Sequence, residues 1–238
     1  MIKVIVQYCN CEEWITKCLL SVAMQADCEY ECIIMDDCST DNSLMLVADA
    51  TRDMPNVRVI KHSEKHWQAR NYYEMAHNYC DDEDIIVTLD GDDWFPDKFV
   101  LKNVEEIYRK NKHLWITWGQ FVCSSGKPGW CSNIEDWPYL RKGPWVTSHL
   151  RTFKAWLFKK IKEKDLKYYG EWTRCTGDKF VLYPMLEMAG PEHSKFIDKA
   201  MYVYNDINPL NEHKVRYQEQ MSAEVYVRNL PPYERIEK

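Results

Sequence analysis

The chain has 238 residues, of which 45% are hydrophobic and 29% are charged, as is typical of a globular protein with a substantial core. A formal net charge of −6 gives no general electrostatic support for binding nucleic acid, so no nucleic-acid partner is expected. No apolar run approaches the roughly 18 residues of a membrane-spanning helix, so a transmembrane protein is not expected either.

The first 122 residues alternate between strand-like and helix-like segments. Strands are predicted over residues 2–8, 31–37, 57–62, 84–90 and 114–122, and helices over residues 12–25, 41–51, 67–79 and 97–110. The connections are short, and the strands are apolar on both faces. This pattern predicts an α/β fold with a mostly parallel sheet flanked by helices.

The alternation stops after residue 122. Residues 123–145 are rich in glycine, proline and tryptophan, which predicts a long loop. Helices are predicted over 152–163 and 178–188, and a strand over 200–204, followed by a polar tail that is expected to be partly mobile. The basic segment 151–164 is interpreted as an amphipathic helix on the sheet rather than a membrane-binding one. The absence of a clean linker favours a single domain with halves at 1–122 and 123–238.

The ten cysteines are predicted to be reduced thiols. There is no CxxC pair, and Cys9/Cys11 and Cys28/Cys32 lack a matching second pair for a structural zinc site. The segment MIKVIVQYCN lacks the long apolar stretch and cleavage site of a signal peptide. We therefore expect a reducing, cytoplasmic location, with most cysteines acting as small hydrophobic residues.

Two acidic clusters follow predicted strands, DDCSTD at 36–41 and DGDD at 90–93. Because the carboxyl ends of parallel strands meet at one edge of a sheet, both clusters should face one crevice. Neither GxGxxG nor GxxxxGK[ST] is present, and a hard cation, Mg²⁺ or Mn²⁺, would take the oxygen ligands offered and offset the repulsion among the carboxylates. For Asp36, Asp37 and Asp41, helix capping is an equally good interpretation.

Four segments occur in a familiar order: VIVQYCNCEEWITKCLLSVAMQ, IIMDDCSTDNS, QARN and LDGDDWF. Together they resemble the family 2 glycosyltransferases of the GT-A fold, and TGDKFVLYPMLEMAG is similar to the family's helix with the catalytic carboxylate. The resemblance spans about residues 1–205. It implies metal-dependent, inverting transfer of a sugar from a nucleoside-diphosphate sugar to an acceptor hydroxyl. UDP is favoured because it is frequent in the family. The resemblance further implies that residues 1–122 bind the donor and that residues 123–238 serve acceptor binding and catalysis.

The resemblance also implies a donor site. Its implied members are Gln7, Tyr8 and Asn10 at the nucleobase, Asp37 with Asp36 and Asp41 at the base and ribose, Arg70 near the nucleotide or its phosphates, and Asp90 at the ribose. Arg70 has an alternative interpretation as a surface ion-pair residue.

The metal is expected at Asp92 and Asp90, with Asp93 as a second metal or sugar contact, and the spacing leaves open whether Asp92 or Asp93 lies nearer the ion. A C-terminal loop histidine, His213 in NPLNEH, is a further candidate ligand by resemblance. His149 and Arg151 precede a predicted helix, whose positive end could meet the diphosphate.

Asp178 is the candidate general base that takes the proton of the acceptor hydroxyl. The alternative is that Asp178 only caps its helix, and Glu171 is the reserve candidate. Thr176 and Gly177 stand where many family members have an acidic residue. Trp130 and its neighbours in the long loop could stack on sugar rings or form a small hydrophobic cluster.

Other functions fit the sequence less well than glycosyl transfer, among them a nucleotidyltransferase, whose glycine-rich N-terminal loop is missing. A phosphatase or phosphotransferase using Asp90 as nucleophile normally has Thr or Val where this chain has Trp94. An EF-hand fails because Phe95 and Leu101 replace the required Gly and Glu. A GT-A-like protein that only binds sugars stays open, although the intact carboxylate set argues against it.

Overall fold

The computed structural model describes residues 1–237, and the side chain of His213 lies outside the described part. The first half alternates as predicted: β1 (Ile2–Tyr8), α1 (Ile15–Ala23), β2 (Tyr30–Asp36), α2 (Ser43–Thr51), β3 (Val57–Lys61), α3 (Trp67–Tyr79), β4 (Ile85–Asp90), α4 (Val100–Lys110) and β5 (Ile116–Cys123). The ranges predicted for β1 and α3 are confirmed to the residue, and the others shift by one to three residues at their ends.

The second half differs more from the prediction. It contains η1 (Trp137–Tyr139), β6 (Thr152–Lys154), α5 (Ala155–Lys159), η2 (Glu163–Leu166), β7 (Lys167–Tyr168), β8 (Glu171–Trp172), α6 (Gly177–Ala189), β9 (Ser194–Tyr204), α7 (Glu212–Val215) and α8 (Tyr217–Asn229). The predicted helix over 152–163 is wrong, because its first three residues form a strand and only a short helix follows. The tail, for which no helix was predicted, contains α7 and α8.

The main sheet has seven strands in the order β3-β2-β1-β4-β6-β5-β9, which confirms the mostly parallel α/β fold. β3, β2, β1 and β4 are parallel neighbours, and β5 is parallel to β9. β6 runs antiparallel between β4 and β5, with Thr152 opposite both Val87 and Thr117. The Thr152 hydroxyl lies 2.6 Å from that of Thr117 and 3.0 Å from that of Tyr108, so its polar group is satisfied inside the core.

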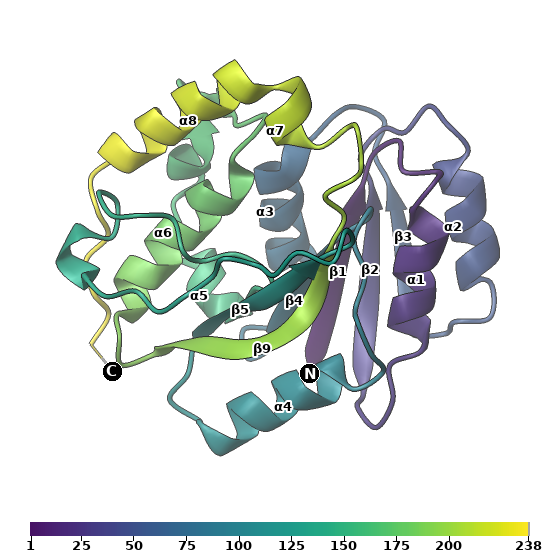
Figure 1. Cartoon of the computed structure of the whole chain (residues 1–238), viewed down its shortest axis with the longest axis horizontal. Helices are drawn as coiled ribbons and strands as arrows, with labels where there is room; N and C mark the ends of the chain where they lie inside the picture. Colours follow the sequence, from purple (N-terminus) through teal and green to yellow (C-terminus); the bar gives the residue numbers. More distant parts are fainter. Residues whose placement is uncertain (238) are drawn as a thin grey trace.

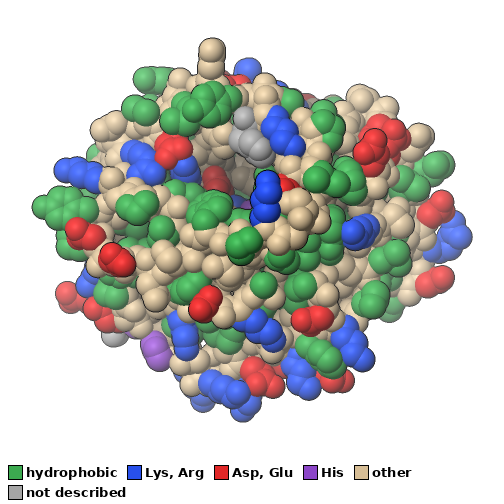
Figure 2. All heavy atoms as spheres, viewed as in Figure 1, with side chains coloured by type: hydrophobic (Ala, Val, Ile, Leu, Met, Phe, Trp, Pro, Cys, Tyr) green, Lys and Arg blue, Asp and Glu red, His purple; other side chains and the backbone are tan. Residues whose placement is uncertain are grey.

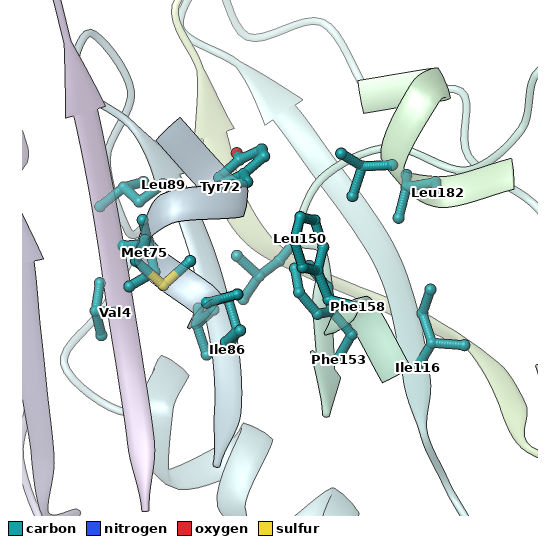
Figure 3. Packing of buried hydrophobic residues seen from close by; sticks show 14 of the residues in the cluster. Val4, Tyr72, Met75, Ile86, Leu89, Ile116, Leu150, Phe153, Phe158 and Leu182 are labelled. Atoms are coloured by element: carbon teal, nitrogen blue, oxygen red, sulfur yellow. The ribbon is translucent and has the colours of Figure 1, made fainter. Parts of the chain in front are cut away.

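Helices cover both faces of the sheet. Figure 1 shows α1 and α2 on one side of β1 and β2, while α3, α5 and α6 pack against one another on the other side. Every residue of β1 is buried, as expected for a central strand covered on both faces. Figure 3 shows Tyr72 and Met75 of α3 over Val4 and Leu89 of the neighbouring strands β1 and β4.

The aromatic and aliphatic residues of the second half continue the same core. The rings of Phe153 in β6 and Phe158 in α5 stack with centroids 5.9 Å apart, and Leu182 of α6 lies close by in Figure 3. The apolar spacing that suggested one long helix therefore arises from a strand and a helix that face one core.

Two further sequence predictions concern cysteines and membrane spans. All ten cysteines are free, and six of them are buried, namely Cys11, Cys18, Cys32, Cys80, Cys131 and Cys175. Within residues 1–237, we find no helix with the length and apolar character needed to cross a bilayer.

Candidate active site

A cavity of about 440 Å³ opens where β1 and β4 end. The face in Figure 2 is hollowed near its centre, with acidic side chains visible inside. Nine of the predicted site residues line the cavity: Gln7, Tyr8, Asn10, Asp37, Asp90, Asp92, Asp93, Arg151 and Asp178. Asp36, Arg70, His149 and the reserve residue Glu171 are not among the described residues that line it, and the His213 side chain lies outside the described part.

Gly91 allows the end of β4 to pass close to β1. A Cβ at this position would lie 2.4 Å from Tyr8 Cβ and 3.2 Å from the Gln7 carbonyl oxygen, so a larger residue would push the strands apart. Its N–H donates to the same carbonyl at 2.9 Å. The close approach places Asp90 and Asp92, on either side of the glycine, beside the carboxyl end of β1.

The surroundings of Asp90 oppose the negative charge of its carboxylate. Burial raises the pKa of its carboxyl to about 6, with further upward contributions from Asp92 and Asp178 and a downward one from Arg151. Gln68 Nε2 donates to its Oδ1 at a long 3.4 Å. The carboxylate is therefore weakly compensated by the protein alone, which is the environment in which a cation would bind.

Asp92 and Asp93 differ in how their oxygens are used. Both oxygens of the buried Asp93 are occupied, since Tyr202 Oη donates to Oδ2 at 2.6 Å and the Asn205 N–H donates to Oδ1 at 2.7 Å. Asp92 accepts from Asn208 Nδ2 at 2.6 Å through Oδ2, and burial raises its pKa. Asp93 thus anchors the chain after β4 to Tyr202 in β9 and to Asn205 just after it, and Asp92 is the better placed of the two for an external ligand.

Arg151 brings a buried positive charge to the same cavity. Its Nη2 lies 3.4 Å from Asp178 Oδ2 and 3.3 Å from His149 Nε2. The reason given for Arg151 and His149, a following helix N-terminus, is wrong because Thr152 begins a strand. Because β6 runs antiparallel to β4, the residues that precede β6 lie beside the carboxyl end of β4. Arg151 is one of these residues.

His149 lies behind the cavity wall. Its ring stacks on Tyr202 with centroids 4.2 Å apart. Burial first, and then the neighbouring Arg151, hold the His149 pKa well below its ordinary value, so the imidazole is neutral. A neutral ring fits its role as acceptor for Arg151.

Asp178 lies in the first turn of α6. Its Oδ1 accepts from the Lys179 N–H at 2.9 Å, while Oδ2 faces Arg151, and the N-cap of the helix is Thr176, which makes no side-chain capping hydrogen bond. Gly177, just before it, packs closely against α3, since a Cβ there would lie 2.7 Å from Gln68 Oε1. The glycine before Asp178 therefore allows α6 to lie close against α3.

The first acidic cluster has the capping contacts that were the alternative interpretation. Asp37 accepts from the N–H groups of His66 at 2.7 Å and Trp67 at 3.0 Å, at the start of α3, and pairs with Lys65 Nζ at 3.3 Å. Asp36 accepts from the Ser39 N–H at 2.9 Å. Asp41 accepts from the N–H groups of two further residues, Glu12 and Ser43. Among these three, Asp37 also faces the cavity.

Arg70 has the contacts expected of an ion-pair residue. Its Nε donates to Glu74 Oε1 at 2.9 Å and its Nη1 to Glu64 Oε1 at 3.1 Å. Among the loop tryptophans, Trp145 packs edge-on against Tyr183 at 5.1 Å and Trp137 against Trp118 at 6.5 Å, which favours the hydrophobic-cluster interpretation for these two. Trp130 is 54% exposed.

Sequence reasoning missed Glu212 as a member of the cavity wall. Its Oε2 accepts from the Thr176 N–H at 3.4 Å, two residues before Asp178. Although Glu212 is an exposed residue, its carboxyl group turns into the cavity, where burial, followed by Asp178, raises its pKa to about 7. The available signal is the polar segment NPLNEH, but no helix is predicted after it from the sequence, so the position of Glu212 could not be predicted.

The oxygen ligands in the cavity fit a hard divalent cation. Asp90 and Asp92 are carboxylates whose charge is opposed by burial, and Arg151, whose positive charge acts on Asp90, also pairs with Asp178. Carboxylate oxygens are the preferred ligands of Mg²⁺ and Mn²⁺.

Comparisons with known proteins give a family and a fold. The Glycosyl transferase family 2 model matches residues 3–183. The teichoic acid poly(glycerol phosphate) polymerase of Staphylococcus epidermidis is 42% identical over 71 residues, which are 29% of this chain and 10% of the polymerase.

Three solved structures are similar throughout most of the chain. TarS 1–349 of S. aureus with UDP-GlcNAc has a TM-score of 0.62 at 20% identity, covering 86% of this chain and 58% of TarS 1–349. A Pyrobaculum calidifontis mannosyltransferase with GDP-Man and Mn²⁺ has a TM-score of 0.67 at 14% identity, covering 98% and 65%. Glucosyl-3-phosphoglycerate synthase of Mycobacterium tuberculosis, with Mn²⁺, UDP and glucosyl-3-phosphoglycerate, has 0.66 at 13%, covering 97% and 81%. At these identities, they show the fold.

Proposed function

Since this chain belongs to glycosyl transferase family 2 and is a glycosyltransferase of the GT-A fold, we propose that it moves a sugar from a nucleoside-diphosphate sugar to an acceptor hydroxyl with inversion. UDP is the proposed nucleotide, in line with TarS and the glucosyl-3-phosphoglycerate synthase, whose solved structures contain UDP-GlcNAc and UDP. Mn²⁺ or Mg²⁺ is the proposed cation. The first half of the chain would bind the donor and the second half the acceptor.

One observation carries the proposal. Three carboxylates, Asp90, Asp92 and Asp178, line one cavity together with the buried Arg151, although Arg151 and Asp178 come from segments far from Asp90 and Asp92 in the chain. A structural role does not require so many acids at one opening, and their repulsion would be offset by a cation and its diphosphate ligand. When bound at Asp90 and Asp92, the cation would supply Lewis-acid stabilisation of the charge on the leaving diphosphate.

The residues of the chain divide the remaining work. Asp178 would accept the proton of the acceptor hydroxyl as that oxygen attacks the anomeric carbon, with the Arg151 guanidinium at 3.4 Å orienting it. Asp37 keeps acceptor capacity beyond the two N–H groups it binds, because each carboxylate oxygen has two lone pairs, and it would accept from the nucleobase. Gln7, Tyr8 and Asn10 would complete that pocket.

The first test is thermal stability against a panel of nucleoside diphosphates with and without Mn²⁺. UDP should raise the melting temperature only when Mn²⁺ is present, by the linkage RT ln(1 + [L]/Kd). If no nucleotide stabilises the protein in the presence of either cation, the proposal is wrong. A different preferred base would correct the donor and leave the site in place.

The second test separates catalysis from binding. Because the acceptor is unidentified, the slow hydrolysis of UDP-sugars by water serves as the assay. Asp178→Asn should lower turnover by about 10²- to 10⁴-fold and keep the UDP–Mn²⁺ stabilisation. Asp92→Asn should lose both, whereas the same substitution at the exposed Asp53, after α2, should change neither. Equal loss of binding and turnover in Asp178→Asn would remove its assigned role.

A further inference from the structure

A second cluster of ligating side chains lies behind the start of α3. His62 directly follows β3, His66 precedes α3, and Glu74 lies within that helix. One ligand atom from each residue lies within 4.8 Å of the others. Both histidines are 8% exposed, so the cluster is not an arrangement of solvated surface groups.

The contacts within the cluster leave one buried ring nitrogen without a hydrogen-bond partner among the described residues. His66 Nδ1 lies 3.1 Å from Glu74 Oε2, and the rings of His62 and His66 are 3.9 Å apart between centroids. His62 Nε2 is buried and has no hydrogen-bond partner among the described residues. A buried polar atom without a partner costs about 1–3 kcal/mol, so such atoms in native proteins call for a ligand or another explanation.

The carboxylate is held in place from its other side. Arg70 Nε donates to Glu74 Oε1 at 2.9 Å, which fixes the carboxylate and leaves Oε2 directed at His66. Metal-ligating carboxylates are commonly held by such a hydrogen bond from a neighbouring residue. Arg70 therefore acquires a role in this cluster that its surface ion pairs alone do not require.

From this geometry, we propose that His62, His66 and Glu74 form a binding site for a divalent transition ion of the Zn²⁺ class. Two imidazole nitrogens and one carboxylate oxygen form a ligand set that binds Zn²⁺ in preference to Mg²⁺. A water molecule would take the fourth position. Zinc–ligand bonds of about 2.0–2.1 Å in a tetrahedron imply ligand atoms about 3.4 Å apart. The 3.1 Å between His66 Nδ1 and Glu74 Oε2 is already close to that spacing.

The site is separate from the cavity but mechanically joined to it. The His66 N–H donates to Asp37 Oδ1 at 2.7 Å, and Asp37 lines the cavity. An ion bound to His66 would tie the end of β3 to α3 and brace the turn on which Asp37 rests. We therefore expect the ion to stabilise the fold and leave the chemistry at Asp178 unaltered.

The test is calorimetric titration of the chelator-treated full chain with Zn²⁺ and, separately, Mg²⁺, together with melting curves. Zn²⁺ should bind at one site and raise the melting temperature, and Mg²⁺ should not compete for that site. His62→Ala and Glu74→Gln should each weaken Zn²⁺ binding by at least about tenfold. His77→Ala, which removes an exposed imidazole from the same helix, should leave the affinity unchanged.

Two controls separate this site from the others. Asp92→Asn should keep full Zn²⁺ binding while losing the nucleotide–Mn²⁺ stabilisation, so the failure of either proposal is recognisable without the other. Co²⁺ in place of Zn²⁺ should give a visible absorption spectrum without thiolate charge-transfer bands. If the wild type binds no Zn²⁺, if His62→Ala and Glu74→Gln both retain its affinity, or if thiolate bands appear, the site is not the one proposed.

Discussion

Asp90→Asn should make the ligand-free protein more stable at neutral pH while abolishing its activity. Burial and the neighbouring acids raise the Asp90 pKa from 3.8 to about 6, so the folded state disfavours the ionised carboxyl. One pKa unit corresponds to about 1.4 kcal/mol, and the shift of roughly two units to about 3 kcal/mol at pH 7.5. Asparagine resembles the protonated acid and removes that cost. A gain of up to about 3 kcal/mol would raise the melting temperature by about 6–12 °C in a chain of this length.

The pH dependence follows from the direction of the shift. Well below pH 3.8, the ordinary pKa of the carboxyl, Asp90 is protonated in both the folded and unfolded chain and costs nothing. As the pH rises from 4 to 6, the unfolded carboxyl ionises first, and the free energy of unfolding of the wild type falls. The advantage of Asp90→Asn should therefore shrink from about 3 kcal/mol at pH 7.5 to about 1 kcal/mol at pH 4.5. Urea unfolding at both pH values measures this change.

A control of opposite sign accompanies this experiment. Asp37→Asn should destabilise the protein by about 1–3 kcal/mol, because its carboxylate accepts two N–H groups and faces Lys65, and an amide offers one acceptor oxygen instead of two. Adding UDP with Mn²⁺ should favour the wild type and reverse its order with Asp90→Asn. If Asp90→Asn is less stable than the wild type at pH 7.5, or its advantage does not change with pH, the view of Asp90 as an uncompensated carboxylate is refuted.

Two further predictions concern the parts that hold the site together, and both are measured by urea unfolding. Gly91→Ala should cost about 1–3 kcal/mol because its Cβ would lie 2.4 Å from Tyr8 Cβ, while Gly143→Ala, where the nearest atom would be 3.5 Å away, should stay within about 0.5 kcal/mol; equal effects would contradict the close approach. Arg141→Met should cost about 3–5 kcal/mol by leaving the Glu187 carboxylate, whose side chain is only 9% exposed, without its ion-pair partner, and the double variant with Glu187→Met should recover most of it.

The sequence was informative where one segment determines its own surroundings. β1 and α3 could be predicted to the residue because a fully covered strand is apolar throughout and because Trp67–Tyr79 forms one uninterrupted helical segment. β6 could not be predicted, because three residues gain strand geometry only from partners in β4 and β5 that are distant in the chain. α8 was missed because it buries few residues, among them Ala223 and Val227.

The same distinction applies to the candidate site. The meeting of Asp37, Asp90 and Asp92 at one cavity follows from the rule that parallel strands end at one edge, so the sequence could predict it. Their hydrogen bonds could not be predicted, and neither could the position of Glu212, because these depend on how the tail returns over α6. The different hydrogen bonds of Asp92 and Asp93 depend on Asn208 and Tyr202, which lie more than 100 residues away in the chain.

Because β6 pairs with β4, the position of Arg151 does not depend on the length of the loop before β6. Its register against β4 is set by three paired residues, and the Thr88 N–H donates to the Arg151 carbonyl at 3.2 Å. The segment 124–148 lies outside this ladder, so the register of β6 does not include it. The Arg151 guanidinium is thus positioned in the cavity by strand pairing rather than by the loop that precedes it.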